Sequence, residues 1–103
     1  MGTTATRALD ETRARRRPAI GAIREGDAVM AEDGTLGPVD RLVRSEADSP
    51  VYLVVRAGRA LRRRYPVVPV SLVTDVDARR RLVELRGHCE AISRLPETLP
   101  LVL

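Results

Sequence analysis

The chain contains very few aromatic residues and lacks several residue types altogether. Its 103 residues include no Phe, Trp, Asn, Gln or Lys, and Tyr52 and Tyr65 are the only aromatics. The interior must therefore be aliphatic, and the chain has 13 valines but only 3 isoleucines. Because β-branched side chains fit a pleated, half-buried surface better than a helix, this composition favours a sheet. Oligomerisation would supplement so small a core, since a domain of this size buries only about 60–65% of its unfolded surface.

Cysteine and long apolar runs are scarce as well. The single cysteine, Cys89, excludes an intrachain disulfide and fits a reducing compartment. No apolar run approaches the ~20 residues that span a bilayer, and the N-terminus lacks the apolar core of a secretory signal. We therefore expect a soluble, cytoplasmic protein without a membrane span. All 18 basic residues are arginines, which we attribute to the codon bias of a GC-rich bacterium.

The positive charge is concentrated at the N-terminus. Residues 1–17 carry a net charge of +3, whereas the other 86 residues together carry +1. This segment has no sustained apolar periodicity, so it cannot bury enough surface to offset its ordering entropy. We predict a disordered basic arm over 1–17, or alternatively a short helix formed on binding. One domain over 18–97 and a short apolar tail over 98–103 follow.

Within the domain, short extended segments alternate with turn signals, a pattern typical of a small all-β fold. Asp33 and Gly34 form the strongest short-range hairpin signal, because a type I′ turn favours φ > 0 at both central residues. A run of arginines between two apolar segments is too charged to be buried, and we expect an exposed loop there. The last predicted strand should alternate, with Val83 and Leu85 inward and Glu84 and Arg86 outward. The predicted strands are 28–32, 36–45, 51–56, 65–73 and 80–86, with turns at 46–50 and 74–78 and the charged loop at 57–64.

The C-terminal part has a different periodicity. Cys89, Ile92 and Leu95 are spaced three apart, which predicts one buried face of a short helix that ends before Pro96. The last five residues are almost wholly apolar. A free tail of that kind would be a liability, so we expect it to dock on the domain or on a second subunit. The candidate self-association residues are Leu99, Leu101, Val102 and Leu103.

Taken in order, these segments resemble the PRC-barrel domain family. The resemblance rests on GDAVMAEDGTLGPVDRLV, VYLVVRAG, the arginine-rich loop, YPVVPVSLVTDV and a helix ending in LPE, and it covers roughly residues 20–97. The family is named for the H subunit of the photosynthetic reaction centre and also provides the second domain of bacterial ribosome-maturation factors. The resemblance implies a small β-barrel of five or six strands with a short C-terminal helix, acting as a docking module without catalytic residues.

Two groups of arginines are candidate anion contacts, because guanidinium groups bind phosphates as bidentate donors. Each group also has a simpler explanation, as a solvated barrel loop or a solubilising tail. Tyr65 is the only aromatic residue beside the loop, so a base-stacking platform is absent. The candidate residues are Arg13, Arg15, Arg16 and Arg17 in the arm and Arg62, Arg63 and Arg64 in the loop.

His88 and Cys89 are adjacent, which raises the question of a metal site or a nucleophile. Structural zinc usually takes four ligands, and neighbouring helical residues point to different faces. Cys89 lies on the apolar stripe and is interpreted as a small buried hydrophobe. Several aspartates are assigned to turns, where Asp bonds its own backbone: Asp33, Asp40, Asp75 and Asp77. We expect no catalytic site, metal or cofactor.

The sequence thus predicts a non-catalytic interaction module that binds another protein or itself, and we expect a homodimer. The alternative is an RNA- or ribosome-associated accessory factor that uses the basic arm and the arginine-rich loop. Nucleic-acid binding would depend strongly on salt, because each phosphate contact contributes about −0.7 to −0.9 to the salt slope.

Overall fold

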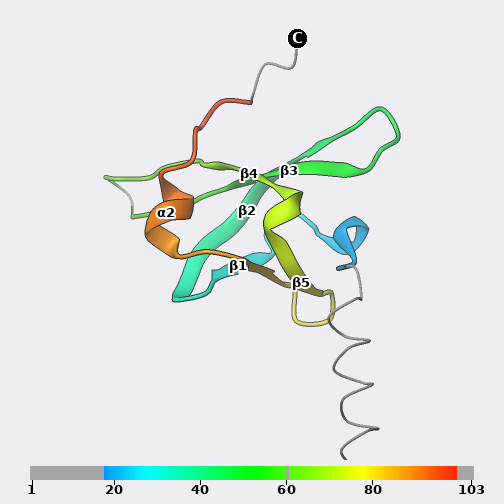
Figure 1. The fold of residues 1–103 in the computed structure, drawn as a ribbon, viewed down its shortest axis with the longest axis horizontal. Coiled ribbons are helices and arrows are strands. Elements are labelled where there is room, and N and C mark those ends of the chain that lie inside the picture. Colours follow the sequence, from blue (N-terminus) through cyan, green and yellow to red (C-terminus); the bar gives the residue numbers. More distant parts are fainter. Residues whose placement is uncertain (1–17, 60, 100–103) are drawn as a thin grey trace, which may run out of the picture.

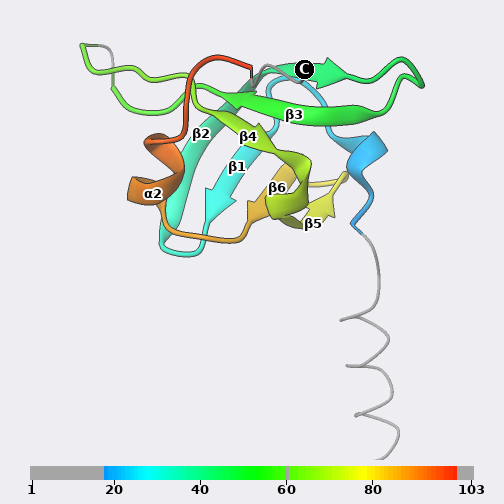
Figure 2. The ribbon, with the colours of Figure 1, turned by 45° about the horizontal axis from the view of Figure 1, so that its top comes forward.

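A computed structural model describes residues 18–59 and 61–99 of the chain. In this part, six strands form one curled, half-barrel sheet with the order β4-β3-β2-β1-β6-β5, next to a short helix (Figures 1 and 2). The predicted arm over 1–17 and residues 100–103 lie outside the described residues. The elements are η1 (Ile20–Ala22), β1 (Ala28–Ala31), β2 (Gly34–Arg44), β3 (Pro50–Val55), β4 (Val67–Pro69), η2 (Val70–Leu72), β5 (Val73–Asp77), β6 (Leu82–Leu85) and α2 (Cys89–Ser93). The expected all-β fold with a short C-terminal helix is confirmed at this level.

The long strand β2 produces the curl, because it belongs to two different pairings. Its first half pairs antiparallel with β1 across the predicted hairpin, and its second half pairs antiparallel with β3. Gly37 lies where the partner changes, with φ of 150°. A Cβ at this position would overlap the carbonyl oxygen of Arg56. Glycine therefore allows Arg56, which directly follows β3, to approach the backbone of β2 closely.

The predicted strand over 65–73 and the predicted turn over 74–78 are wrong. The structure divides this region into β4, the 3-10 turn η2, and β5, which pairs antiparallel with β6. Val73 is buried and Val76 half-buried, so the polar residues between them occupy the solvent side of a strand. The real turn comes later, where the Asp77 carboxylate accepts hydrogen bonds from the backbone N–H groups of Arg79 and Arg80, each at 3.1 Å.

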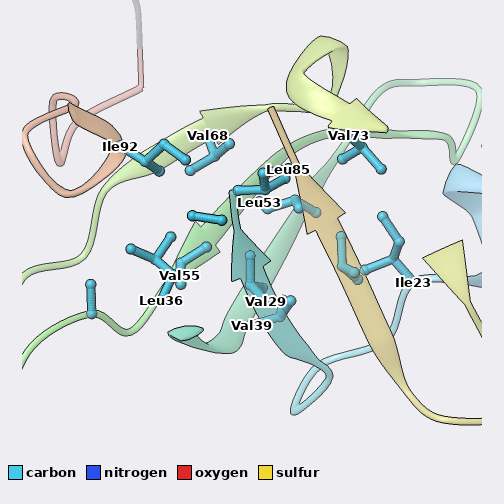
Figure 3. Close-up of a cluster of buried hydrophobic side chains, with 13 residues drawn as sticks. Ile23, Val29, Leu36, Val39, Leu53, Val55, Val68, Val73, Leu85 and Ile92 are labelled. Atoms are coloured by element: carbon cyan, nitrogen blue, oxygen red, sulfur yellow. The ribbon is translucent and has the colours of Figure 1, made fainter. Parts of the chain in front are cut away.

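The concave side of the sheet encloses an aliphatic core (Figure 3). Ile92 of α2 is buried in it, and Cys89 and Leu95 pack against it, as the predicted helical stripe requires. In β6, Val83 and Leu85 are buried and Glu84 is exposed, so the predicted alternation is also confirmed. The core comprises Ile23, Val29, Ala31, Leu36, Val39, Leu53, Val55, Ala57, Val68, Val73, Val83, Leu85 and Ile92.

In the part of the chain that the structure describes, one carboxylate, that of Asp27, is buried; it lies at the corner where β1, β2 and β6 meet and is only 2% exposed. Its Oδ2 accepts a hydrogen bond from the Arg24 backbone N–H at 2.9 Å, and its Oδ1 accepts one from Arg81 Nε at 2.9 Å. Its main-chain carbonyl accepts from the Val39 N–H at 2.8 Å. Arg81 also donates a hydrogen bond from its Nη2 to the carbonyl of Glu25 at 2.8 Å. Asp27 thereby joins segments that are 54 residues apart.

We expect Asp27→Ala to lower the free energy of unfolding by about 2–3 kcal/mol, because it removes both acceptors of a buried, charge-assisted network. This expected loss of stability is at the low end of the range for breaking a buried ion pair, because the Arg81 side chain is 58% exposed. Urea unfolding measures the change. Asp40→Ala, which removes an exposed carboxylate from β2, is the control and should change the free energy by less than about 0.5 kcal/mol. Equal effects of the two variants would refute the structural role of Asp27.

Candidate functional site

The arginine-rich loop, residues 56–64, connects β3 to β4 and projects from one end of the sheet (Figures 1 and 2). Two backbone hydrogen bonds close its base, from Ala57 N–H to the Arg64 carbonyl and from Arg64 N–H to the Ala57 carbonyl, both at 2.8 Å. A tighter bond inside the loop runs from Arg62 N–H to the Arg59 carbonyl at 2.7 Å. Hydrogen bonds therefore close the loop at its base and link Arg59 to Arg62 further out.

The predicted loop residues Arg62, Arg63 and Arg64 are all exposed, and they lead directly into β4. Exposure of this loop is thus confirmed. Within residues 18–59 and 61–99, no carboxylate lies within ion-pair distance of an arginine in this loop, whereas four other arginines have such partners. The loop consequently presents concentrated positive charge to solvent.

Sequence analysis did not identify Leu61 as a site residue. Its side chain is 99% exposed, next to the guanidinium-bearing Arg59 and Arg62, with which it lines a shallow hollow. The available signal was an isolated apolar residue within the charged run RALRRR. A lone exposed leucine is common, but one held on a projecting, closed loop and surrounded by arginines is suited to contact a partner.

Gly58 fixes the geometry of this loop. Its φ of 82° lies in the left-handed region. A Cβ here would overlap the carbonyl oxygen of Arg62. Any other residue would strain the backbone and push apart the two sides of the loop.

A second candidate surface is an apolar groove beside the C-terminal segment, about 550 Å³ in volume. Leu99, one of the predicted self-association residues, lies on its wall and is 44% exposed. Leu101, Val102 and Leu103 lie outside the described residues, as do Arg13, Arg15, Arg16 and Arg17 of the predicted arm. The groove is lined by Tyr52, Val67, Pro69, Leu95, Pro96, Thr98 and Leu99.

The strand beside this groove, β4, is at the end of the sheet, but its outer edge is covered. Val67 N–H donates to the carbonyl of Pro96 at 2.9 Å, and Tyr65 N–H donates to Oε1 of Glu97 at 2.7 Å. Pro66 and Pro69 have no N–H to offer. The edge is therefore unsuited to adding a partner strand, and contacts in the groove would be made by side chains.

Cys89, at the start of α2, contacts the hairpin turn between β1 and β2. The N–H of Cys89 donates to Asp33 Oδ1 at 2.7 Å, and its Sγ lies 3.5 Å from the Gly34 carbonyl. Burial and the Asp33 carboxylate raise the pKa of the Cys89 thiol, which disfavours the nucleophilic thiolate. The hydrogen bond from the Cys89 backbone lowers the pKa of Asp33.

The turn assignment of two aspartates is wrong. Asp40 and Asp75 lie within β2 and β5, because their alternating apolar neighbours face the core. Asp33 does lie in the hairpin turn, but it also accepts the hydrogen bond from the start of α2. Among the described residues, no group of three or more His, Cys, Asp or Glu side chains could hold a metal ion.

A scan against models of protein families finds none that matches the chain, and a search of curated proteins finds no similar sequence. No helix in the described part of the chain is long and apolar enough to cross a membrane. The functional argument therefore depends on the geometry of the arginine-rich loop and of the apolar groove.

We expect Gly58→Ala to open the arginine-rich loop while leaving the sheet folded, because the added Cβ introduces about 2 kcal/mol of local strain. Native-state hydrogen exchange at the amides of Ala57 and Arg64 should become about tenfold faster or more. Gly21→Ala is the matched control, since nothing lies within 4 Å of a Cβ at that position. Unchanged protection of both amides would show that Gly58 does not define the loop.

Proposed function

We propose that the protein is a non-catalytic interaction module of the PRC-barrel type, which binds an acidic protein partner through the arginine-rich loop. The observation that carries this proposal is the fully exposed Leu61 among arginines on a closed, projecting loop. As part of the same proposal, the module acts in the bacterial cytoplasm and associates as a homodimer.

The composition of the loop matches that of protein interfaces. Arginine is enriched in protein–protein contacts, and an apolar side chain buried in a partner's socket provides a central anchor. Burying Leu61 would contribute about 1.5–3 kcal/mol. Because backbone hydrogen bonds already fix the loop, less conformational entropy is lost on binding. The surrounding arginines would steer an acidic partner to the loop and accelerate association.

The second candidate function is an RNA- or ribosome-associated accessory factor. The exposed Arg62, Arg63 and Arg64 favour it, together with the arm residues Arg13, Arg15, Arg16 and Arg17. Tyr65 is half-buried and follows the loop, so the loop itself offers guanidinium groups without an aromatic ring. Leu61 adds nothing to phosphate contacts. We therefore favour the protein partner.

A photo-crosslinking residue in place of Leu61 distinguishes these functions. We expect irradiation of producing cells to give one dominant protein adduct of acidic composition, which is lost when Arg62 and Arg63 are also changed to Ala. The loss follows from removing the charges that attract the partner. Mass spectrometry and nuclease treatment identify the crosslinked molecule.

The control carries the crosslinker at Ser71, an exposed residue of η2. Adducts that nuclease removes would support the RNA-associated function instead. A pattern identical to that of the Ser71 control would refute a binding role for the loop.

Self-association through the apolar groove is tested by deleting residues 99–103. We expect sedimentation velocity to show the full-length chain, whose mass is 11.3 kDa, as a dimer and the truncated chain as a monomer. The reason is that the deletion removes Leu99 from the groove wall together with the other apolar residues of the tail. Leu61→Ser, which removes a fully exposed leucine outside the groove, should leave the dimer intact. An unchanged mass after truncation would contradict the role of the tail.

A further inference from the structure

A cleft of about 310 Å³ lies between the segment around η1 and the turn that joins β5 to β6. In both views, η1 and this turn are at the opposite end of the sheet from the arginine-rich loop (Figures 1 and 2). Arg24 lines the first wall, next to the small residues Gly21 and Ala22, and Arg79 and Arg81 line the second. Three guanidinium groups from two distant segments of the chain thus border one small cavity.

Among residues 18–59 and 61–99, Asp27 is the only carboxylate that lines this cleft, and both of its oxygens accept hydrogen bonds. Oδ2 accepts a hydrogen bond from the backbone N–H of Arg24. This contact does not involve the Arg24 guanidinium and so does not neutralise its charge. Oδ1 accepts from Arg81 Nε. Three positive side chains therefore share one negative group, and the cleft has a local excess of positive charge.

Arg81 is held in place before any ligand arrives. Its Nε donates a hydrogen bond to Asp27, and its Nη2 donates one to the Glu25 carbonyl. Its backbone has a left-handed φ of 54°. These contacts leave further N–H groups of the guanidinium available. A donor fixed in this way loses little side-chain entropy when it binds an anion.

The three consecutive arginines of the turn have different environments. Arg80 lies 3.7 Å from the carboxylate of Asp77 and does not line the cleft, whereas Arg79 lines it. Within the described ranges, no carboxylate lies within ion-pair distance of Arg79 or Arg24. Of the three arginines that line the cleft, the two without such a partner therefore come from its two different segments.

We propose that this cleft binds a phosphate group, with Arg81 as the fixed donor and Arg24 and Arg79 closing over the anion. Guanidinium groups match the geometry of phosphate oxygens and form charge-assisted, bidentate hydrogen bonds. The small residues beside Arg24 leave room for the group. The phosphate comes either from a free polyphosphate compound or from a nucleic-acid backbone, since both present the same oxygens.

The test is a nitrogen-15 NMR titration of the full chain with sodium tripolyphosphate, and separately with a short single-stranded RNA, at low salt. We expect shifts at the amides of 21–27 and 78–81. The double variant of Arg24→Ala and Arg79→Ala should weaken binding by roughly tenfold or more, because two charge-assisted contacts are lost. Both substitutions keep the backbone N–H groups and leave the Asp27–Arg81 pair intact.

Arg86→Ala is the matched control, since Arg86 is an exposed arginine at the far end of β6. Selective weakening of tripolyphosphate binding by the double variant supports a free phosphate ligand, and selective weakening of RNA binding supports a backbone phosphate. Equal effects of the double variant and Arg86→Ala would overturn the proposal. Shifts confined to the arginine-rich loop, or no binding of either probe by the unaltered chain, would also overturn it.

Discussion

The hydrogen-bonded carboxylate of Asp27 is the interaction on which the arrangement of the strands depends. β1 and β6 are parallel neighbours with Val29 opposite Val83, although they are far apart in the sequence. A slip of one residue would turn the apolar side chains of one strand away from the core. Asp27 fixes this register because it binds Arg81 through its side chain, and the N–H of Ala28 donates to the Arg81 carbonyl at 2.9 Å.

This anchoring does not involve the arginine-rich loop at the other end of the sheet. The core is filled by side chains of the curled sheet and of α2, without any contribution from the arginine-rich loop beyond Ala57. The outer edge of β4 is covered by the segment around Pro96. The loop is thus held at its base by strands that do not depend on its tip. Residues at the tip can accordingly serve recognition without loss of packing.

Local patterns in the sequence predicted the parts of the fold that local physics determines. The hairpin at Asp33 and Gly34, the alternation in β6 and the stripe on α2 were all found in this way. The strand β5 was missed because its three polar residues outnumber its two valines. Parallel pairing of β1 with β6 was not predictable, since no short-range pattern encodes a partner so distant. For the same reason, nothing in the sequence indicated that Arg24 and Arg79 border one cleft.

The charge balance of the domain shows why composition alone was a poor guide to binding. Outside residues 1–17 the net charge is only +1, a value that indicates no strongly charged surface. However, several acidic residues form ion pairs with particular arginines. Asp27 pairs with Arg81, and Glu90 lies 2.7 Å from Arg94. Other arginines are thereby left to concentrate at the loop and at the cleft. Because salt screens exposed charges beyond about 8–10 Å, a ligand at either surface responds to the nearby arginines and not to the net charge.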